Sequence, residues 1–240
     1  MRTIIFCEGT TDLLMIQFIL QYRYGWRYDG FVENTVTNKL LKRKLVKGNS
    51  YLEINSCGGI MNIPSELYKL KDKLQLATKN EELFDRVIVM IDHDTVNSNE
   101  EFIGQINLKL DTDYVVSQIN LEVGWTIDNP IIGKINISLF VKSIPEEETG
   151  AIETVMLKAL ETDSVEAGLI ADATVFVNDI ASKQSRYLQK KSRVSKAIFN
   201  TYFAIRTPEE KYDERARILK AYDWENNEVI NGSFSFLDVD

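Results

Sequence analysis

Carboxylates follow two apolar segments of the chain at the point where each segment ends. The segment Thr3–Cys7 runs directly into Glu8, and the later segment Arg86–Ile91 runs into Asp92. In an open parallel sheet, functional groups gather at the carboxyl ends of the strands. Several carboxylates in one place repel one another unless a cation offsets their charge, and a set of oxygen ligands suits Mg²⁺ or Mn²⁺. The pattern predicts a metal site with four carboxylate ligands: Glu8, Asp12, Asp92 and Asp94.

The spacing within each motif is compatible with a shared site. Gly9 allows a sharp turn between strand and helix, and Asp12 then lies one helical turn beyond Glu8. Asp94 comes two residues after Asp92, so both side chains point to the same side if the chain stays extended. Two metal ions about 4 Å apart at such a site would stabilise both oxygens of an in-line phosphoryl displacement. The alternative is that Asp-x-Asp at a strand end forms only a turn or a helix cap.

The order of the predicted elements indicates an α/β fold. Strands and helices alternate at residues 3–7, 10–24, 51–56, 64–77 and 86–91, and a further helix follows. This order implies a mainly parallel sheet with right-handed crossovers, flanked by helices. Residues 25–50 are polar and basic, and we expect a surface segment there with at most one short helix. Strands at 123–128 and 134–144 are predicted to form a hairpin at the sheet edge.

The second part of the chain is predicted to be almost entirely helical. Helices are expected at 151–161, 164–181, 184–205 and 209–222. No linker rich in Gly, Ser or Pro separates the two parts. We therefore expect an α/β domain over residues 1–145 and a helical C-terminal extension over residues 146–240 packed on it.

Composition narrows the protein class. The 240 residues contain 28 Lys and Arg against 36 Asp and Glu, a net charge of −8, which argues against nonspecific nucleic-acid binding over the whole surface. No apolar run approaches the ~18 residues of a membrane span, and no signal peptide is recognised, so a cytoplasmic protein that does not enter the membrane is expected. The two cysteines, Cys7 and Cys57, form neither a zinc pattern nor a disulfide framework. The one histidine, His93, is predicted to be structural.

A basic segment interrupts this acidic chain. Residues 183–206 contain seven Lys and Arg residues and no acid. If the segment is one helix, a single face carries four of them: Lys183, Arg186, Lys190 and Arg193. Such a face predicts a track for the phosphate backbone of a nucleic acid, with Lys196 at its border. The alternative is the solvated face of an amphipathic helix.

Three short motifs resemble those of one known family: Glu8-Gly9, Gly58-Gly59 and Asp92-His93-Asp94. They resemble the TOPRIM domain, the metal-binding module of topoisomerases, primases, small ribonucleases and OLD-family nucleases. The Glu-Gly-x-x-Asp sequence from Glu8 to Asp12 looks most like the OLD-like branch. The resemblance implies a TOPRIM-like, Rossmannoid sheet over residues 1–145. It also implies that Glu8 acts in acid–base or metal chemistry, while Asp92 and Asp94 hold the metal.

Two further segments resemble the OLD-like branch. The sequence Gly150–Glu153 before an apolar helix is similar to its Gly-x-x-Glu segment, which implies that Glu153 is a further metal ligand. Lys196 lies in a basic helix like one that carries a functional lysine in those nucleases. OLD proteins also contain an ATPase domain, whereas this chain has no Gly-x-x-x-x-Gly-Lys-Ser/Thr loop. The resemblance therefore implies a standalone TOPRIM protein, with an ATPase partner supplied in trans.

The function predicted from these features is hydrolysis of phosphodiester bonds in DNA or RNA by a nuclease that depends on Mg²⁺ or Mn²⁺. Glu8 and Lys196 are the predicted catalytic residues, with Lys196 neutralising charge in the transition state. One alternative is a phosphatase resembling the haloacid dehalogenases, with Asp92 as nucleophile and Asp94 as acid–base. That motif normally lies near the start of its domain, and it leaves Glu8 unexplained. The other alternative is a TOPRIM fold that serves as a non-catalytic binding or regulatory subunit.

Overall fold

The computed structural model describes residues 1–33, 40–95, 98–110, 123–183, 186–208, 222–223 and 225–238. The chain forms two compact units. The first comprises chiefly Met1–Ile91 and Asn97–Lys142, and the second comprises Asp92–Val96 and Ser143–Asp238. The last residue of one central strand, Asp92, and the residues directly after it therefore belong to the same unit as the C-terminal helices.

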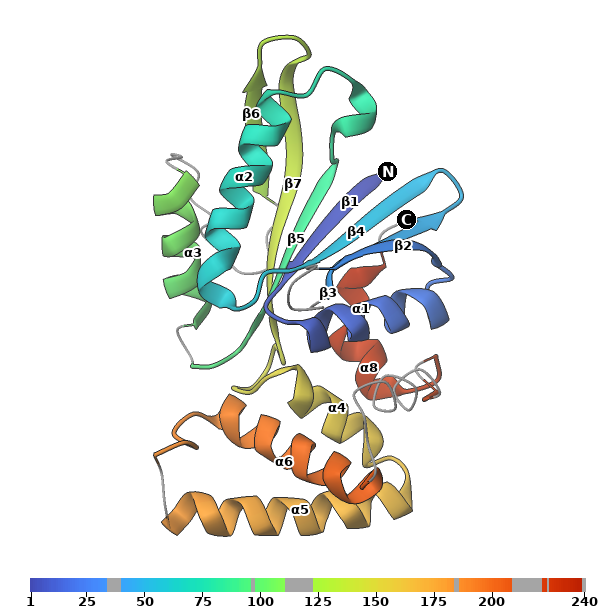
Figure 1. The fold of residues 1–240 in the computed structure, drawn as a ribbon, viewed down its shortest axis with the longest axis vertical. Coiled ribbons are helices and arrows are strands. Elements are labelled where there is room, and N and C mark those ends of the chain that lie inside the picture. Colours follow the sequence, from blue (N-terminus) through green and yellow to red (C-terminus); the bar gives the residue numbers. More distant parts are fainter. Residues whose placement is uncertain are drawn as a thin grey trace. The chain divides into compact units, whose positions relative to one another are not determined.

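A seven-stranded sheet forms the centre of the first unit, in the order β2-β3-β4-β1-β5-β7-β6 (Figure 1). Its strands are β1 Arg2–Cys7, β2 Arg27–Glu33, β3 Leu40–Lys47, β4 Ser50–Ser56, β5 Arg86–Asp92, β6 Val123–Asn129 and β7 Gly133–Ile144. The central strand β1 pairs in parallel with β4 and β5. β2 and β3, β3 and β4, and β6 and β7 pair antiparallel. The predicted α/β class is confirmed.

Helices cover both faces of this sheet because its central strands are apolar on both sides. On one face, Ile4, Phe6 and Val89 share a core with α2 (Ile63–Gln75) and α3 (Ser98–Leu110). Side chains alternate along a strand, so Ile5 and Ile88 point to the other face, where α1 (Thr10–Tyr22) lies against β3 and β4.

Helices make up most of the second unit. They are α4 Ile152–Leu160, α5 Ser164–Lys183, α6 Lys191–Arg206 and α8 Glu228–Ser233, followed by the short turn Ser235–Leu237. α6 packs against both α4 and α5, and α4 also packs against α8. Phe203 is fully buried, with its ring centroid 4.7 Å from that of Phe199 and 5.0 Å from that of Tyr202. All three rings lie on α6, so they form part of the buried face of this helix.

The structure corrects two of the predicted elements. Within the range 25–50, the described residues Arg27–Glu33 and Leu40–Lys47 form the strands β2 and β3 rather than an irregular surface segment. The two strands pair with each other, although no residue of β2 is buried. The helix predicted at 184–205 begins only at Lys191, since Lys190 has extended backbone angles (φ −108°, ψ 145°). The predicted helix at 209–222 lies outside the described residues apart from its last position. The hairpin formed by β6 and β7 at the sheet edge is confirmed.

Candidate functional site

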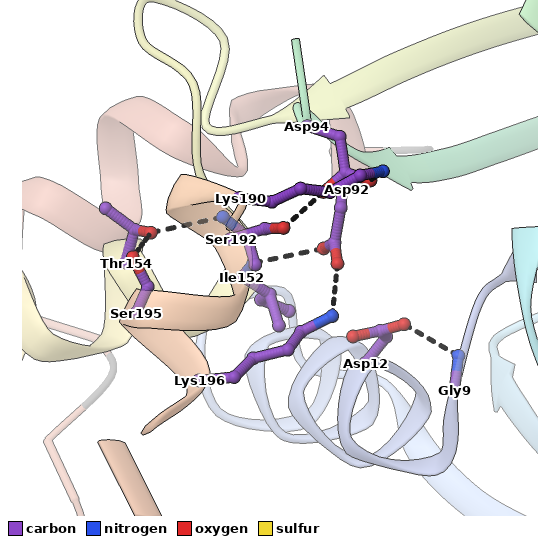
Figure 2. A network of polar contacts seen from close by, with 11 residues as sticks. Gly9, Asp12, Asp92, Asp94, Ile152, Thr154, Lys190, Ser192, Ser195 and Lys196 are labelled. Carbon is purple, nitrogen blue, oxygen red and sulfur yellow. Dashed lines mark hydrogen bonds and ion pairs between the residues drawn. The ribbon is translucent and has the colours of Figure 1, made fainter. Parts of the chain in front are cut away.

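Asp92, the last residue of β5, is the most buried acid of the predicted Asp-x-Asp motif. Its side chain is only 9% exposed, and its Oδ2 forms an ion pair with Nζ of Lys196 on α6 (Figure 2). Its other oxygen, Oδ1, accepts a hydrogen bond of 3.4 Å from the backbone N–H of Ile152 at the start of α4. A carboxylate in such a place is costly unless positive charge and N–H donors compensate it, and both are present.

Asp94 receives two further side chains from the start of α6. Nζ of Lys190 lies 2.6 Å from Oδ2, and Oγ of Ser192 donates a hydrogen bond to Oδ1 (Figure 2). Ser192 and Lys196 are four residues apart and therefore lie on the same side of α6. One helix thus brings two ammonium groups and one hydroxyl to two carboxylates. Ser192 is a site residue that the sequence reasoning missed.

Backbone hydrogen bonds hold the Asp-x-Asp segment extended. The N–H of His93 donates to the carbonyl of Ile144 at 3.2 Å, and the N–H of Gly150 donates to the carbonyl of His93 at 2.7 Å. The His93 ring contacts the carbonyl oxygen of Pro145 through Nδ1 at 3.0 Å. Because alternate side chains of an extended segment point to opposite sides, Asp92 and Asp94 share one side and His93 takes the other.

The pKa values of the two carboxyl groups are shifted in opposite directions. Burial raises the pKa of Asp92, and the nearby Lys196 ammonium and Ile152 N–H only partly offset that effect. Burial acts in the same direction on Asp94, but it is outweighed by the hydrogen bonds from Lys190 and Ser192, so the pKa of Asp94 is lowered. Two neighbouring acids with displaced pKa values are typical of functional sites, although structural ion pairs also produce such shifts.

α6 carries these groups on a rigid support. Tyr202 Oη donates a 2.6 Å hydrogen bond to Glu166 of α5, and Nε of Arg206 contacts the same carboxylate at 3.0 Å. On the α4 side, Oγ1 of Thr154 donates to Oγ of Ser195 at 2.9 Å. α6 is therefore connected to α4 beside Lys196 and to α5 near its own C-terminal end, and both contacts limit the movement of the helix.

Gly150, which precedes α4, lies very close to the side chains of Thr154 and Pro145. A Cβ atom at Gly150 would lie 2.5 Å from Thr154 Oγ1, 3.1 Å from Thr154 Cβ and 3.2 Å from Pro145 Cδ. Gly150→Ala should therefore lower the free energy of unfolding by about 1–2 kcal/mol, because Thr154 has to move and loosen its bond to Ser195. Urea denaturation measures this. The control is Gly168→Ala in α5, where nothing lies within 4 Å of the added Cβ and which should be neutral or slightly stabilising. Equal effects of both substitutions would contradict the prediction.

The other predicted ligands are divided between the units. Glu153 lies in the first turn of α4 and is 8% exposed. Glu8 and Asp12 belong to the first unit, where Asp12 Oδ2 accepts a 2.8 Å hydrogen bond from the N–H of Gly9 at the start of α1. The carbonyl oxygen of Glu8 accepts from Gly59 N–H at 2.8 Å, which ties the end of β1 to the turn after β4. In the chain order of the sheet, Glu8 follows β1 and Asp92 ends its parallel neighbour β5.

The four residues predicted to share a basic helical face do not lie on one helix. Lys183 ends α5, where it pairs with Asp179 at 2.5 Å, and Arg186 lies in the connection to α6 beside the Tyr187 ring. Lys190 precedes the first residue of α6, and only Arg193 is helical there. The prediction of a continuous basic face was wrong, because the chain is extended at Lys190 and the helical periodicity is broken there.

The donor set can be tested for its fit to a divalent cation. Mg²⁺ is usually held by one or two carboxylates, with water and substrate phosphate completing its shell. Asp92 and Asp94 supply such oxygens, but one oxygen of each is already paired with an ammonium group, so a cation would have to take the place of Lys190 and Lys196 at these oxygens. Across the described ranges, no three side chains of His, Cys, Asp or Glu are grouped closely enough to hold a metal ion. A cation at this pair would therefore depend on water and substrate oxygens for the rest of its shell, because the described protein ligands form no cage.

The fold and the site define an α/β protein in which a central strand ends in two acids held by lysines of a helical unit. Residues 2–235 match the family described as "Protein of unknown function (DUF3226)", and the chain belongs to this family. A hypothetical protein from Pyrococcus horikoshii OT3 has a similar structure, with a TM-score of 0.59 and 16% sequence identity over 99% of this chain and 96% of that chain. At this identity the similarity shows the fold alone. No curated protein matches the sequence. Among the described helices, none has the length and apolar character that a bilayer crossing requires.

Proposed function

We propose that this protein is a nuclease that hydrolyses phosphodiester bonds with the help of Mg²⁺ or Mn²⁺. The proposal depends on the ion pairs and the hydrogen bond that Asp92 and Asp94 form with Lys190, Ser192 and Lys196. Phosphodiester hydrolysis needs positive charge at the oxygens of the phosphoryl group and a scaffold that holds that charge in place. Two acids and two lysines on rigid elements provide both.

Each residue has a role that follows from its contacts. Asp92 and Asp94 would hold the cation, which when bound acts as a Lewis acid on a phosphoryl oxygen. Ser192 donates to Asp94 Oδ1 and so fixes the orientation of that carboxylate. Lys196 places its ammonium at Asp92 Oδ2, from where Nζ can donate to an oxygen of the scissile phosphate. Glu8, at the end of the neighbouring strand, is the proposed acid–base group.

The resemblance to TOPRIM nucleases supports the same proposal independently of the lysine contacts. Strand β1 ends before Glu8-Gly9 and its parallel neighbour β5 ends in Asp92, which is the order of motifs that the family requires. The lysines from α6 add a feature that the two acidic motifs alone did not predict. An ATPase partner in trans is part of the proposal and rests on the resemblance alone.

The test is cleavage of supercoiled plasmid DNA and of labelled single-stranded RNA. Purified protein should cut at least one substrate with Mg²⁺ or Mn²⁺ and should stop when EDTA is added. Asp92→Asn protein, prepared in parallel, controls for contaminating nucleases. Cleavage that persists in EDTA would reject the metal-dependent mechanism. Absence of cleavage with either metal, by protein that binds nucleic acid, would favour the non-catalytic alternative.

A further inference from the structure

The hairpin formed by β2 and β3 exposes aromatic side chains beside basic ones at the edge of the sheet. Phe31 is 53% exposed and Tyr28 is 37% exposed, although both lie within a strand. Along the described residues of β2 and β3, five basic side chains stand against two acids: Arg27, Lys42, Arg43, Lys44 and Lys47 against Asp29 and Glu33. In a chain with a net charge of −8, this is a local reversal of sign.

A β-bulge brings the two aromatic rings to the same face. Tyr28 pairs with Leu45 and Gly30 pairs with Lys44, so Asp29 is an extra residue in β2. Without that residue, side chains three positions apart would point to opposite faces. With it, Tyr28 and Phe31 lie on one face together with Arg43, which is the cross-strand partner of Phe31.

Arg43 organises the two rings. Its guanidinium lies 5.1 Å from the ring centroid of Tyr28 and 5.4 Å from that of Phe31, and its Nη1 donates a 3.0 Å hydrogen bond to the Tyr28 hydroxyl. These contacts reduce the rotamer freedom of the aromatic side chains before any ligand arrives. An exposed, pre-ordered set of two rings and a guanidinium is a stacking surface.

We infer that this β2–β3 surface, defined by Tyr28, Phe31, Arg43 and Lys47, binds single-stranded nucleic acid. Lys47 lies four residues after Arg43 in β3 and therefore points to the same face as the rings. Bases stack on exposed aromatic rings and on guanidinium planes, and the neighbouring basic side chains neutralise backbone phosphates. Bases of a duplex are stacked inside the helix and cannot reach the rings, so a single strand is the expected ligand. This inference rests on the proposed function, because it names the single strand as the substrate class of the nuclease.

The experiment measures binding in EDTA, by fluorescence anisotropy of labelled oligothymidylate and oligouridylate with the full-length protein. Phe31→Ala should weaken binding about tenfold, since stacking on an aromatic ring contributes ~1–3 kcal/mol per base. Phe31→Leu keeps an apolar side chain but removes the ring, and it should weaken binding in the same way. Lys47→Ala should lower the slope of log affinity against log salt by about 0.7, as the loss of one phosphate contact does for a single strand.

Matched controls lie elsewhere on the molecule. Phe176 of α5 is 57% exposed, and Lys69 of α2 has a side chain 69% exposed, so Phe176→Ala and Lys69→Ala remove similar groups outside the β2–β3 surface. Both should leave the affinity unchanged. Circular dichroism and the unfolding midpoint establish that each variant is folded.

Two outcomes would overturn the inference. One is an equal affinity of wild type and both Phe31 variants for single strands, and the other is tighter binding of duplex DNA than of either single strand. Because EDTA prevents metal-dependent cleavage, this result is independent of whether the protein is a nuclease. Single-strand binding without any cleavage would support the binding surface and contradict the nuclease activity. Cleavage together with unaltered binding by the Phe31 variants would support the nuclease activity and contradict the binding surface.

Discussion

Asp92→Asn should reduce metal-dependent cleavage by about a thousandfold or more, because a metal ligand contributes several kcal/mol to the stabilisation of the transition state. Asparagine keeps the size of the side chain and an oxygen that accepts from Ile152 N–H, but it removes the negative charge. Stability should change by no more than about 1 kcal/mol, since replacing one charge of a buried pair with a neutral isostere also removes a desolvation cost. Lys196, whose side chain is 42% exposed, regains water when the carboxylate is gone.

Rates of plasmid or RNA cleavage under single-turnover conditions measure the effect, and urea denaturation measures stability in the same preparations. The control is Asp172→Asn, which removes an exposed acid of α5 and should alter neither quantity. A wild-type rate for Asp92→Asn would remove Asp92 from the chemistry. A loss of activity that merely follows a loss of folded protein would assign Asp92 a structural role only.

The acidic end of β5 was predictable because local signals in the sequence agree. An uninterrupted apolar run predicts a strand buried on both faces, and its end is marked by Asp92. The glycine that follows Glu8 similarly marks the start of α1. Both signals are confined to a few residues, and sequence patterns are informative at that range. The strands that carry Glu8 and Asp92 were therefore predicted with nearly the observed bounds.

The family resemblance pointed to Lys196, but the contacts of the two lysines were not predictable from the sequence pattern, because they join residues far apart in the chain. Lys190 and Asp94 are 96 residues apart, and Lys196 and Asp92 are 104 apart. No periodicity specifies which carboxylate a lysine reaches. The start of α6 was also mispredicted, since Lys190 has a favourable helix propensity but is the extended residue that precedes the helix. Tertiary structure outweighs propensity at that point.

The β2–β3 hairpin was missed for a different reason. Strand prediction depends on alternation of apolar and polar residues, but β2 is exposed along nearly its whole length. The bulge at Asp29 shifts the alternation by one residue within the strand. The basic residues of β3 further resemble a solvated loop, although Leu45 among them is completely buried. A pattern that fits neither a half-buried strand nor a helix was interpreted as irregular.

The charges at the end of β5 make the site costly to maintain. Desolvation raises the pKa of Asp92 even with Lys196 in contact, so its ionised form is held against a penalty. Replacing such a pair with apolar side chains is often neutral or stabilising in other proteins. Stability alone therefore does not account for the arrangement. A function that uses the charges would account for it, as the proposed phosphodiester hydrolysis does.

Lys196→Met should lower the free energy of unfolding at neutral pH by about 2–3 kcal/mol. Removing one partner of a buried pair typically costs 3–5 kcal/mol, and the partial exposure of Lys196 reduces that figure. Methionine keeps the length and apolar part of the side chain, so the decrease in the free energy of unfolding measures the contribution of the ammonium group. Lys158→Met is the matched control, because Lys158 pairs with Glu148 at the surface, where both side chains are substantially exposed, and its loss should cost at most about 1 kcal/mol.

A double-mutant cycle with Asp92→Asn assigns the effect to the contact. If the ammonium stabilises the ionised carboxylate, the double variant should be about 2 kcal/mol more stable than the sum of the single effects predicts. The deficit of Lys196→Met should also shrink as the pH is lowered. Without the lysine, the pKa of Asp92 in the folded protein rises further above its unfolded value, so the folded state binds the extra proton and gains stability as pH falls through that folded pKa. Additive single effects, or a deficit that does not change with pH, would show that Lys196 acts through packing instead of through its charge.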